Sequence, residues 1–317
     1  MSVVRTAVPW GRISRVATAG ALATALVACG SSSGGSSGGS SGGGSGGSTS
    51  ADGTTSVLQG DPAVIVASSA DRTTAAKNAT VNLTGDVTAQ GRTVPLNGTG
   101  AIDFANQTFL LNITIPGMGA IEERFLDKVI YVKVPTQAAS EFGGKSWLKI
   151  DPSAFGSSGQ NPFGSLDSSN PAQILNTLQG AGNVTRIGDE DVRGAHTVHY
   201  RADVDIAKAA DKQGLTPQQK QQLQQALGDQ TTVPENVWLD DQGRVSRLAV
   251  DVTATPKTGT GASATSPGPV KTKVQMEFFD YGKAMTAISA PPADQVTDFS
   301  QILGQLGQLG GSSGTSS

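Results

Sequence analysis

Apolar and polar residues alternate at every second position in three runs within residues 79–115. A period of two predicts β-strands with one buried face and one face in water, as in antiparallel sheets. Gly91 and the pair Ala105-Asn106 separate the runs, and we expect Gly98 and Gly100 to mark further turns or bends. The apolar positions are Val81, Leu83, Val87, Leu96, Ile102, Phe104, Phe109, Leu111, Ile113 and Ile115.

Shorter runs of the same kind continue almost to the end of the chain. We expect turns at Asp127-Lys128, in the acidic stretch Gly188 to Asp191, and in a hairpin loop from Asp240 to Gly243. Segments rich in Gly, Ser and Pro, residues 152–169 and 256–269, are expected to be loops. The remaining predicted strands are 121–126, 129–134, 147–151, 184–187, 195–205, 237–239, 245–252 and 270–278.

The sequence shows three helix starts, one before the first strand run and two between later runs. Asp61-Pro62, Asn170-Pro171 and Thr216-Pro217 each place an N-cap residue before a proline at the first helical position. The second helix would present Ile174 and Leu178 on one face. Helices between runs of half-buried strands predict an antiparallel α+β domain.

The N-terminus resembles an export signal. Arg5, Arg12 and Arg15 precede a small apolar stretch, Val16 to Ala28, which is too short to span a bilayer. The sole cysteine, Cys29, follows it directly, so we interpret Cys29 as the lipidation site of a bacterial lipoprotein. A plain secretory signal is the alternative, but it would leave the exported protein with an odd, unexplained thiol.

Twenty of the 21 residues from Gly30 to Ser50 are Gly or Ser, a composition that cannot bury a core. We therefore divide the chain into a signal peptide at 1–28, a lipidated cysteine and disordered tether at 29–53, one α+β domain at 54–300, and a flexible polar tail at 301–317. The tether would hold the domain about 25–30 Å from its anchor.

Charge and residue types argue against catalysis. The chain carries 23 Lys and Arg against 26 Asp and Glu, scattered without a basic stripe, so we expect no nucleic-acid partner. His196 and His199 lie three apart on a predicted strand and would point to opposite faces. The acid pair Glu122-Glu123 would do the same. We expect no metal, no cofactor and no enzyme activity, with a hydrolase the least favoured reading.

Several segments together resemble actinobacterial lipoproteins of the LppX/LprG type. The segments are Thr74 to Val87, Leu96 to Asp103, Val129 to Lys133, Trp147 to Ile150, Gly194 to Tyr200, Val237 to Asp240 and Gly243 to Val245. The resemblance runs in order over about residues 61–290. It implies a LolA/LolB-like fold, which is a curved antiparallel half-barrel with helices packed on its concave face and an apolar cavity that takes acyl chains.

That resemblance leads to two hypotheses. The first is a lipoprotein anchored on the extracytoplasmic face of the cell membrane, a monomer that binds or transfers acylated lipids or glycolipids. The alternative is a cell-surface sensor or protein-interaction module of the same fold with a closed pocket and an envelope protein as partner. The cavity candidates, which could equally be ordinary core, are Leu83, Ile102, Leu111, Ile113, Phe125, Ile174, Leu178, Leu248 and Phe278.

Overall fold

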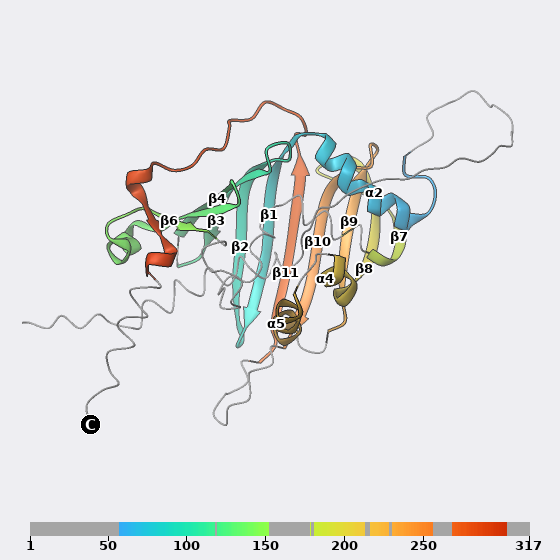
Figure 1. Ribbon diagram of the computed structural model, residues 1–317. Helices are drawn as coiled ribbons and strands as arrows, with labels where there is room; N and C mark the ends of the chain where they lie inside the picture. Colours follow the sequence, from blue (N-terminus) through green and yellow to red (C-terminus); the bar gives the residue numbers. More distant parts are fainter. Residues whose placement is uncertain are drawn as a thin grey trace, which may run out of the picture.

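The computed structural model describes residues 57–117, 119–151, 178, 181–212, 216–227, 230–255 and 268–302. These ranges form a 12-stranded sheet with the order β12-β6-β5-β4-β3-β2-β1-β11-β10-β9-β8-β7 (Figure 1). Its strands are β1 (Asn78–Ala89), β2 (Arg92–Asp103), β3 (Thr108–Ile115), β4 (Gly119–Leu126), β5 (Val129–Lys133), β6 (Trp147–Ile150), β7 (Ala181–Val192), β8 (Ala195–Asp205), β9 (Thr232–Asp240), β10 (Val245–Ala254), β11 (Val270–Phe279) and β12 (Val296–Asp298).

The sheet consists of two meanders. Strands β1 to β6 follow one another outward on one side, and β7 to β11 follow one another inward from the opposite edge. Antiparallel pairing of β1 with β11 joins them and brings residues nearly 200 positions apart into register, with Val81 opposite Phe278. The short strand β12, which the sequence pattern did not predict, pairs in parallel with β6.

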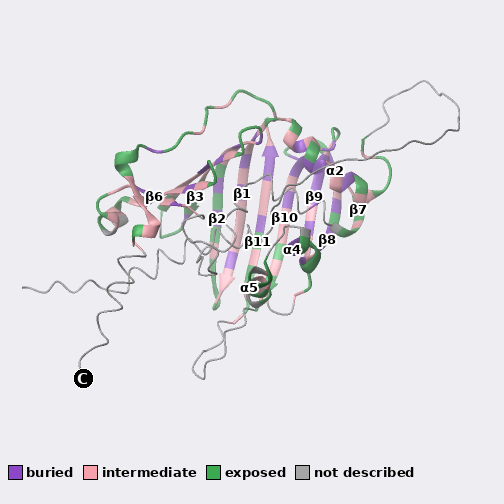
Figure 2. Cartoon of the chain, in the orientation of Figure 1, coloured by how far each residue is buried: buried purple, intermediate pink, exposed green. Residues whose placement is uncertain are grey.

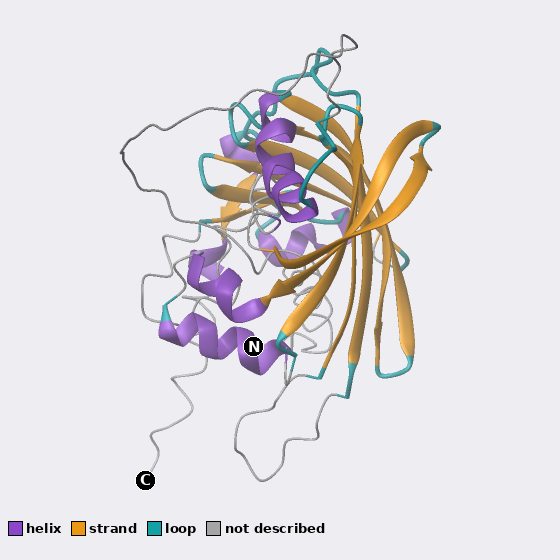
Figure 3. Ribbon diagram, turned by 90° about the vertical axis from the view of Figure 1, so that its right-hand side faces the viewer, coloured by secondary structure: helices purple, strands orange, loops and turns teal. Residues whose placement is uncertain are grey.

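The sheet is strongly curved, and the helices lie on its concave side (Figure 3). They are α2 (Pro62–Ala75), α4 (Ile206–Lys212) and α5 (Pro217–Leu227), with 3-10 turns η1 (Thr136–Phe142) and η4 (Ala293–Gln295). The predicted fold class, a curved antiparallel half-barrel with helices on its concave face, is therefore confirmed.

The predicted first helix is confirmed, including its cap. The Asp61 carboxylate accepts a hydrogen bond from the Ala63 amide at 2.8 Å, and Pro62 opens α2. Thr73 on the buried side of this helix accepts a hydrogen bond from the Val245 amide at 2.9 Å, which ties α2 to the start of β10. The helix predicted after Asn170 lies outside the described residues except for Leu178, which is helical.

Turns or bends were predicted at Gly98 and Gly100, and turns at these positions are wrong, because both residues lie inside β2. Their role is to let neighbouring strands approach. A β-carbon on Gly100 would lie 2.0 Å from the Leu110 carbonyl oxygen on β3, and one on Gly85 of β1 would lie 2.2 Å from the Lys273 carbonyl oxygen on β11. Glycine at such close approaches permits a sharp bend of the sheet without ending the strand.

The prediction of an acidic turn from Gly188 to Asp191 is also wrong. Strand β7 continues through this stretch to Val192, with a register shift between Arg186 and Gly188. The turn that follows is formed by Arg193 and Gly194, which both have positive φ, at 54° and 78°. Carboxylates usually favour turns, but here cross-strand partners hold them in the strand.

Intermediate and buried residues alternate along β1 from Asn78 to Leu83, as the period of two predicts (Figure 2). The buried apolar residues form two clusters. The core cluster is Ile65, Val66, Ala70, Ala79, Val81, Ile102, Phe104, Phe109, Phe125, Ile130, Val134, Leu148, Ile150, Leu178, Val198, Tyr200, Val237, Leu239, Val245, Leu248 and Phe278. The hairpin-end cluster, near the β1–β2 turn, is Leu83, Val87, Leu96, Ile115 and Val274.

Several predictions fall on residues outside the described ranges. The signal peptide, Cys29, the tether and most of the segments 152–169 and 256–269 are among them. Of the predicted tail, Gln301 and Ile302 are described; both are helical, and Ile302 packs against the core cluster. Among the described residues, no helix is both long and apolar enough to cross a membrane.

Candidate functional site

The register of the strands places nearly all the cavity candidates on one face of the sheet, here called the inner face. Val81 is opposite Phe278, and Leu83 is opposite Met276. From there the pairings continue outward in both directions, to Leu248 on β10 and to Ile102, Leu111, Ile113 and Phe125 on β2, β3 and β4. A two-residue period, kept through every register, therefore collects side chains from six strands onto a single surface.

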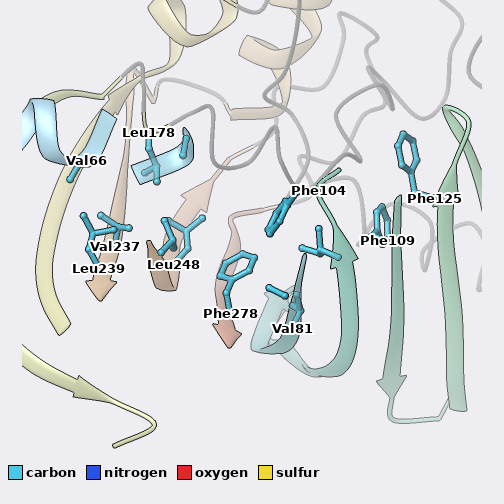
Figure 4. Close-up of a cluster of buried hydrophobic side chains, with 14 of the residues drawn as sticks. Val66, Val81, Phe104, Phe109, Phe125, Leu178, Val237, Leu239, Leu248 and Phe278 are labelled. Carbon is cyan, nitrogen blue, oxygen red and sulfur yellow. The ribbon is translucent and has the colours of Figure 1, made fainter. Parts of the chain in front are cut away.

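Leu178 comes from the connection between β6 and β7, which lie at opposite sides of the sheet. It is buried among the inner-face residues and lies near Val237, Leu239 and Leu248 (Figure 4). The connection therefore passes over the inner face at this residue. Ile174, predicted beside Leu178, lies outside the described residues.

The candidates differ in burial. Leu83, Ile102, Phe125, Leu178, Leu248 and Phe278 are all at most 4% exposed. Leu111 and Ile113 are only half-buried, although they lie on the same face. Half-buried Val94, Ile121 and Met276 belong with them, packed against the hairpin-end cluster, and sequence reasoning did not select these three. The inner face thus has a filled part and a part where apolar side chains stay partly uncovered.

Leu111 and Met276 connect the two parts, because each packs against both the core cluster and the hairpin-end cluster. On the core side, Phe109 stacks on Phe125 with ring centroids 5.7 Å apart, which continues the apolar surface toward β4 (Figure 4). Such a continuous surface offers no group for covalent chemistry. It can bury apolar ligand atoms.

Glu123 places an acid in the part of the inner face formed by β3, β4 and β5, and Glu235 places another on β9, opposite Val250. Glu123 on β4 is opposite Leu111 on β3 and Val132 on β5, and it lies two residues from both Ile121 and Phe125. Within the described ranges its carboxyl group has no hydrogen-bond or ion-pair partner. Burial raises the pKa of Glu123 to about 7, since a charge is poorly solvated among apolar side chains.

Sequence reasoning placed Glu122 and Glu123 on opposite faces, which the register confirms, but it did not select Glu123 for the site. Glu122 lies on the outer face, where its carboxylate accepts a hydrogen bond from Arg124 at 2.8 Å and lies 3.9 Å from the Lys133 ammonium. The sequence already indicated this position, because Ile121, Glu123 and Phe125 are two residues apart and therefore point to the same face of the strand.

The outer face carries polar clusters with their partners in place. His199 stacks on Trp238 with centroids 4.1 Å apart, and its Nδ1 lies 2.9 Å from a Glu190 carboxylate oxygen. Hydrogen bonds from Trp238 and His199 lower the pKa of Glu190. His196 lies on the other face from His199, near the start of β8, and contacts Asp241 at 2.9 Å, an interaction that raises the pKa of this histidine. The two histidines therefore contact different carboxylates and do not form one site.

Among the residues that the structure describes, no three His, Cys, Asp or Glu side chains are grouped so that they could hold a metal ion. The inner face, a mostly apolar surface that includes Glu123, remains the feature best suited to a ligand. It defines the class of molecule: a half-barrel with an apolar concave face.

Comparison with known proteins gives two sequence relatives from Streptomyces. An uncharacterised 31.2 kDa protein of Streptomyces griseus is 28% identical over 204 residues, which is 62% of each chain. A protein of Streptomyces coelicolor that is named as a lipoprotein is 25% identical over 216 residues, 67% of this chain and 63% of that one. The matches therefore span less than two thirds of these relatives. No model of a known protein family matches the chain.

Solved structures similar to this chain include the lipoprotein LppX of Mycobacterium tuberculosis, with 15% identity, a TM-score of 0.43, and coverage of 72% of this chain and 100% of that one. LprF from Mycobacterium bovis has 15% identity, a TM-score of 0.38, and coverage of 72% and 96%. The lipoprotein type that the sequence resembles takes its name from LppX and LprG. The half-barrel itself is defined by its own strand pairing, independently of these superpositions.

Proposed function

We propose that this protein is a membrane-anchored lipoprotein that binds or transfers acylated lipids or glycolipids, with the acyl chains on the inner face. The observation that carries the proposal is the half-buried apolar surface formed by Leu111, Ile113 and Ile121 beside a fully buried core. Apolar side chains that remain partly uncovered on a concave face are suited to cover an apolar ligand.

The binding energy would come from burial. Each methylene removed from water contributes about 0.8 kcal/mol, so a chain of a dozen carbons gains enough to offset the cost of its immobilisation. The polar head would remain at the rim, in water. In this role the protein needs no catalytic group.

The location follows from the N-terminus. The signal-like segment before Cys29 and the Gly/Ser tether after it support anchoring through acyl chains on the extracytoplasmic face of the cell membrane, with the domain a short distance away. The Streptomyces coelicolor relative named as a lipoprotein supports the same assignment.

A second candidate is favoured by a different observation. Leu83, Leu178 and Phe278 are 2%, 1% and 2% exposed, which is the burial of an ordinary core. If the rest of the inner face closes in the same way, the domain would act as a non-catalytic sensor or interaction module that binds another envelope protein.

Native mass spectrometry with organic extraction tests the first proposal. The full chain with Cys29→Ser, which removes the anchor and its own acyl chains, is purified from an actinobacterial host. Acylated lipid at near-unit stoichiometry would support a carrier. An empty protein that also fails to take up added lipid would contradict it and leave the interaction module as the better account.

A further inference from the structure

The part of the inner face formed by β3, β4 and β5 holds a feature that a simple hydrophobic carrier does not need, namely Glu123. Its cross-strand neighbour Leu111 packs against both apolar clusters. An acyl chain that extends from the core cluster toward the hairpin-end cluster would therefore pass this carboxyl group. The position is central to the surface, away from the outer-face ion pairs.

The surroundings of Glu123 contain no charge that would neutralise it. On β3 the inner-face side chains are Phe109, Leu111 and Ile113, and on β5 they are Ile130 and Val132. The described inner-face positions of these two neighbouring strands are thus all apolar. No described element packed beside Glu123 offers it a titratable or cationic group on this face.

An unpartnered acid in an apolar surface costs stability, since burial of a carboxyl group without a hydrogen bond is unfavourable. A Leu at this position would remove the cost. Glu123 is half-buried as a residue, so a ligand that lies on the inner face can contact its side chain. The ligand group that makes this contact would have to be a hydrogen-bond donor or a neutral polar group, because an anion would be repelled.

Resting on the proposed function, we propose that Glu123 contacts the bound lipid and selects neutral, hydroxyl-bearing acyl lipids over lipids whose anionic group would lie at this point. A lipid hydroxyl donates its hydrogen bond to the ionised carboxylate. The protonated carboxyl group both donates to and accepts from the same hydroxyl. A phosphate, sulfate or carboxylate on the ligand instead meets the negative charge of Glu123 in a region of low polarity.

The test compares two probes with the same chain, oleyl alcohol and oleyl sulfate, whose sulfate stays ionised at every pH used. Binding to the full chain with Cys29→Ser is measured at pH 8 by displacement of the neutral dye Nile red, at probe concentrations below micelle formation. We expect the alcohol to bind about tenfold or more tightly than the sulfate. In Glu123→Gln, which keeps the shape and removes the charge, the ratio should fall to about threefold or less.

Glu122→Gln is the matched control, because it removes a carboxylate one residue away on the outer face and should leave the ratio unchanged. At pH 6, where Glu123 is protonated, the preference for oleyl alcohol over oleyl sulfate should also be smaller in the unsubstituted protein. In Glu123→Gln this preference should be the same at pH 6 and pH 8. Binding of both probes without discrimination, or discrimination that survives Glu123→Gln, would overturn this inference and leave the proposed function intact. Failure of every form to bind either probe would overturn both.

Discussion

A β-carbon placed on Gly100 would lie 2.0 Å from the carbonyl oxygen of Leu110 on the adjacent strand. A contact this short requires the backbones of β2 and β3 to separate, because a carbonyl oxygen in a strand cannot rotate away as a side chain can. The missing side chain at Gly100 therefore allows the close approach of β2 and β3.

Gly100→Ala is therefore expected to destabilise the fold by about 2–3 kcal/mol. Gly188→Ala provides the control within the same sheet, because a β-carbon there meets nothing within 4 Å and its φ is not in the left-handed region. It should change stability by less than about 0.5 kcal/mol. Urea unfolding followed by circular dichroism measures both, and equal stabilities for the two variants would show that β2 and β3 separate at little cost.

The raised pKa of Glu123 predicts that stability falls as the pH rises. The unfolded chain loses this proton near 4.5, whereas the folded protein holds it until about 7. Between these values the folded state binds more protons than the unfolded state, so the free energy of unfolding decreases by up to about 3 kcal/mol as the pH rises. Above the folded pKa, Glu123 contributes no further change with pH.

Glu123→Gln removes that dependence, since an amide does not titrate in this range. Its stability relative to the unsubstituted protein should therefore be greater at pH 8 than at pH 5. Urea unfolding at half-unit steps of pH from 4 to 8 measures the difference between the two proteins, which cancels the other titrating groups. A difference that stays constant over this range would mean that Glu123 is solvated in the folded state.

Two buried tyrosines are expected to respond differently to loss of the hydroxyl group. Tyr281 donates a hydrogen bond to the Val245 carbonyl, so Tyr281→Phe should cost about 1–1.5 kcal/mol. Tyr200 is fully buried, and its hydroxyl group makes no hydrogen bond of good geometry within the part of the chain that is described. Burial raises the pKa of Tyr200, and the nearby Arg186 opposes this only in part.

Tyr200→Phe is accordingly expected to be neutral or to stabilise the protein by up to about 1 kcal/mol, because the buried polar atom disappears while the ring remains. The two variants differ from their parent by the same single oxygen atom, so thermal unfolding of both under one condition gives a direct comparison. A loss at Tyr200 as large as that at Tyr281 would show that Arg186 or a bound water satisfies the hydroxyl group.

Most of the fold could be predicted because its strands keep a period of two. The pattern that identified Val81, Leu83 and Val87 as one face also determined which residues meet once the registers are formed. Gly100 and the acidic stretch after Gly188 could not be predicted in this way. Their local composition favours turns, and only the neighbouring strand explains why they remain extended.

The site was predictable to a similar degree. The alternation placed Leu111 and Ile113 correctly on the inner face, but it could not separate residues packed in a core from residues left half-buried. That distinction depends on what covers each side chain from elements distant in the sequence. Glu123 was missed because the opposite faces of Glu122 and Glu123 were used only to exclude a joint catalytic role, without asking which side chains surround Glu123.

If the half-buried part of the inner face receives acyl chains, a larger side chain there should exclude them. Ile113 is opposite Gly98, so the ring in Ile113→Trp can extend over a position that has no side chain. Displacing about two methylenes of a ligand should weaken lipid binding about tenfold. Thr114→Trp adds the same ring one residue away, on the exposed outer face, and should leave binding unchanged. Oleyl alcohol binding and thermal unfolding are measured for both variants. We expect Ile113→Trp alone to lose binding affinity, with the unfolding temperature of both variants unchanged. Equal binding by the two variants would place the acyl chains elsewhere.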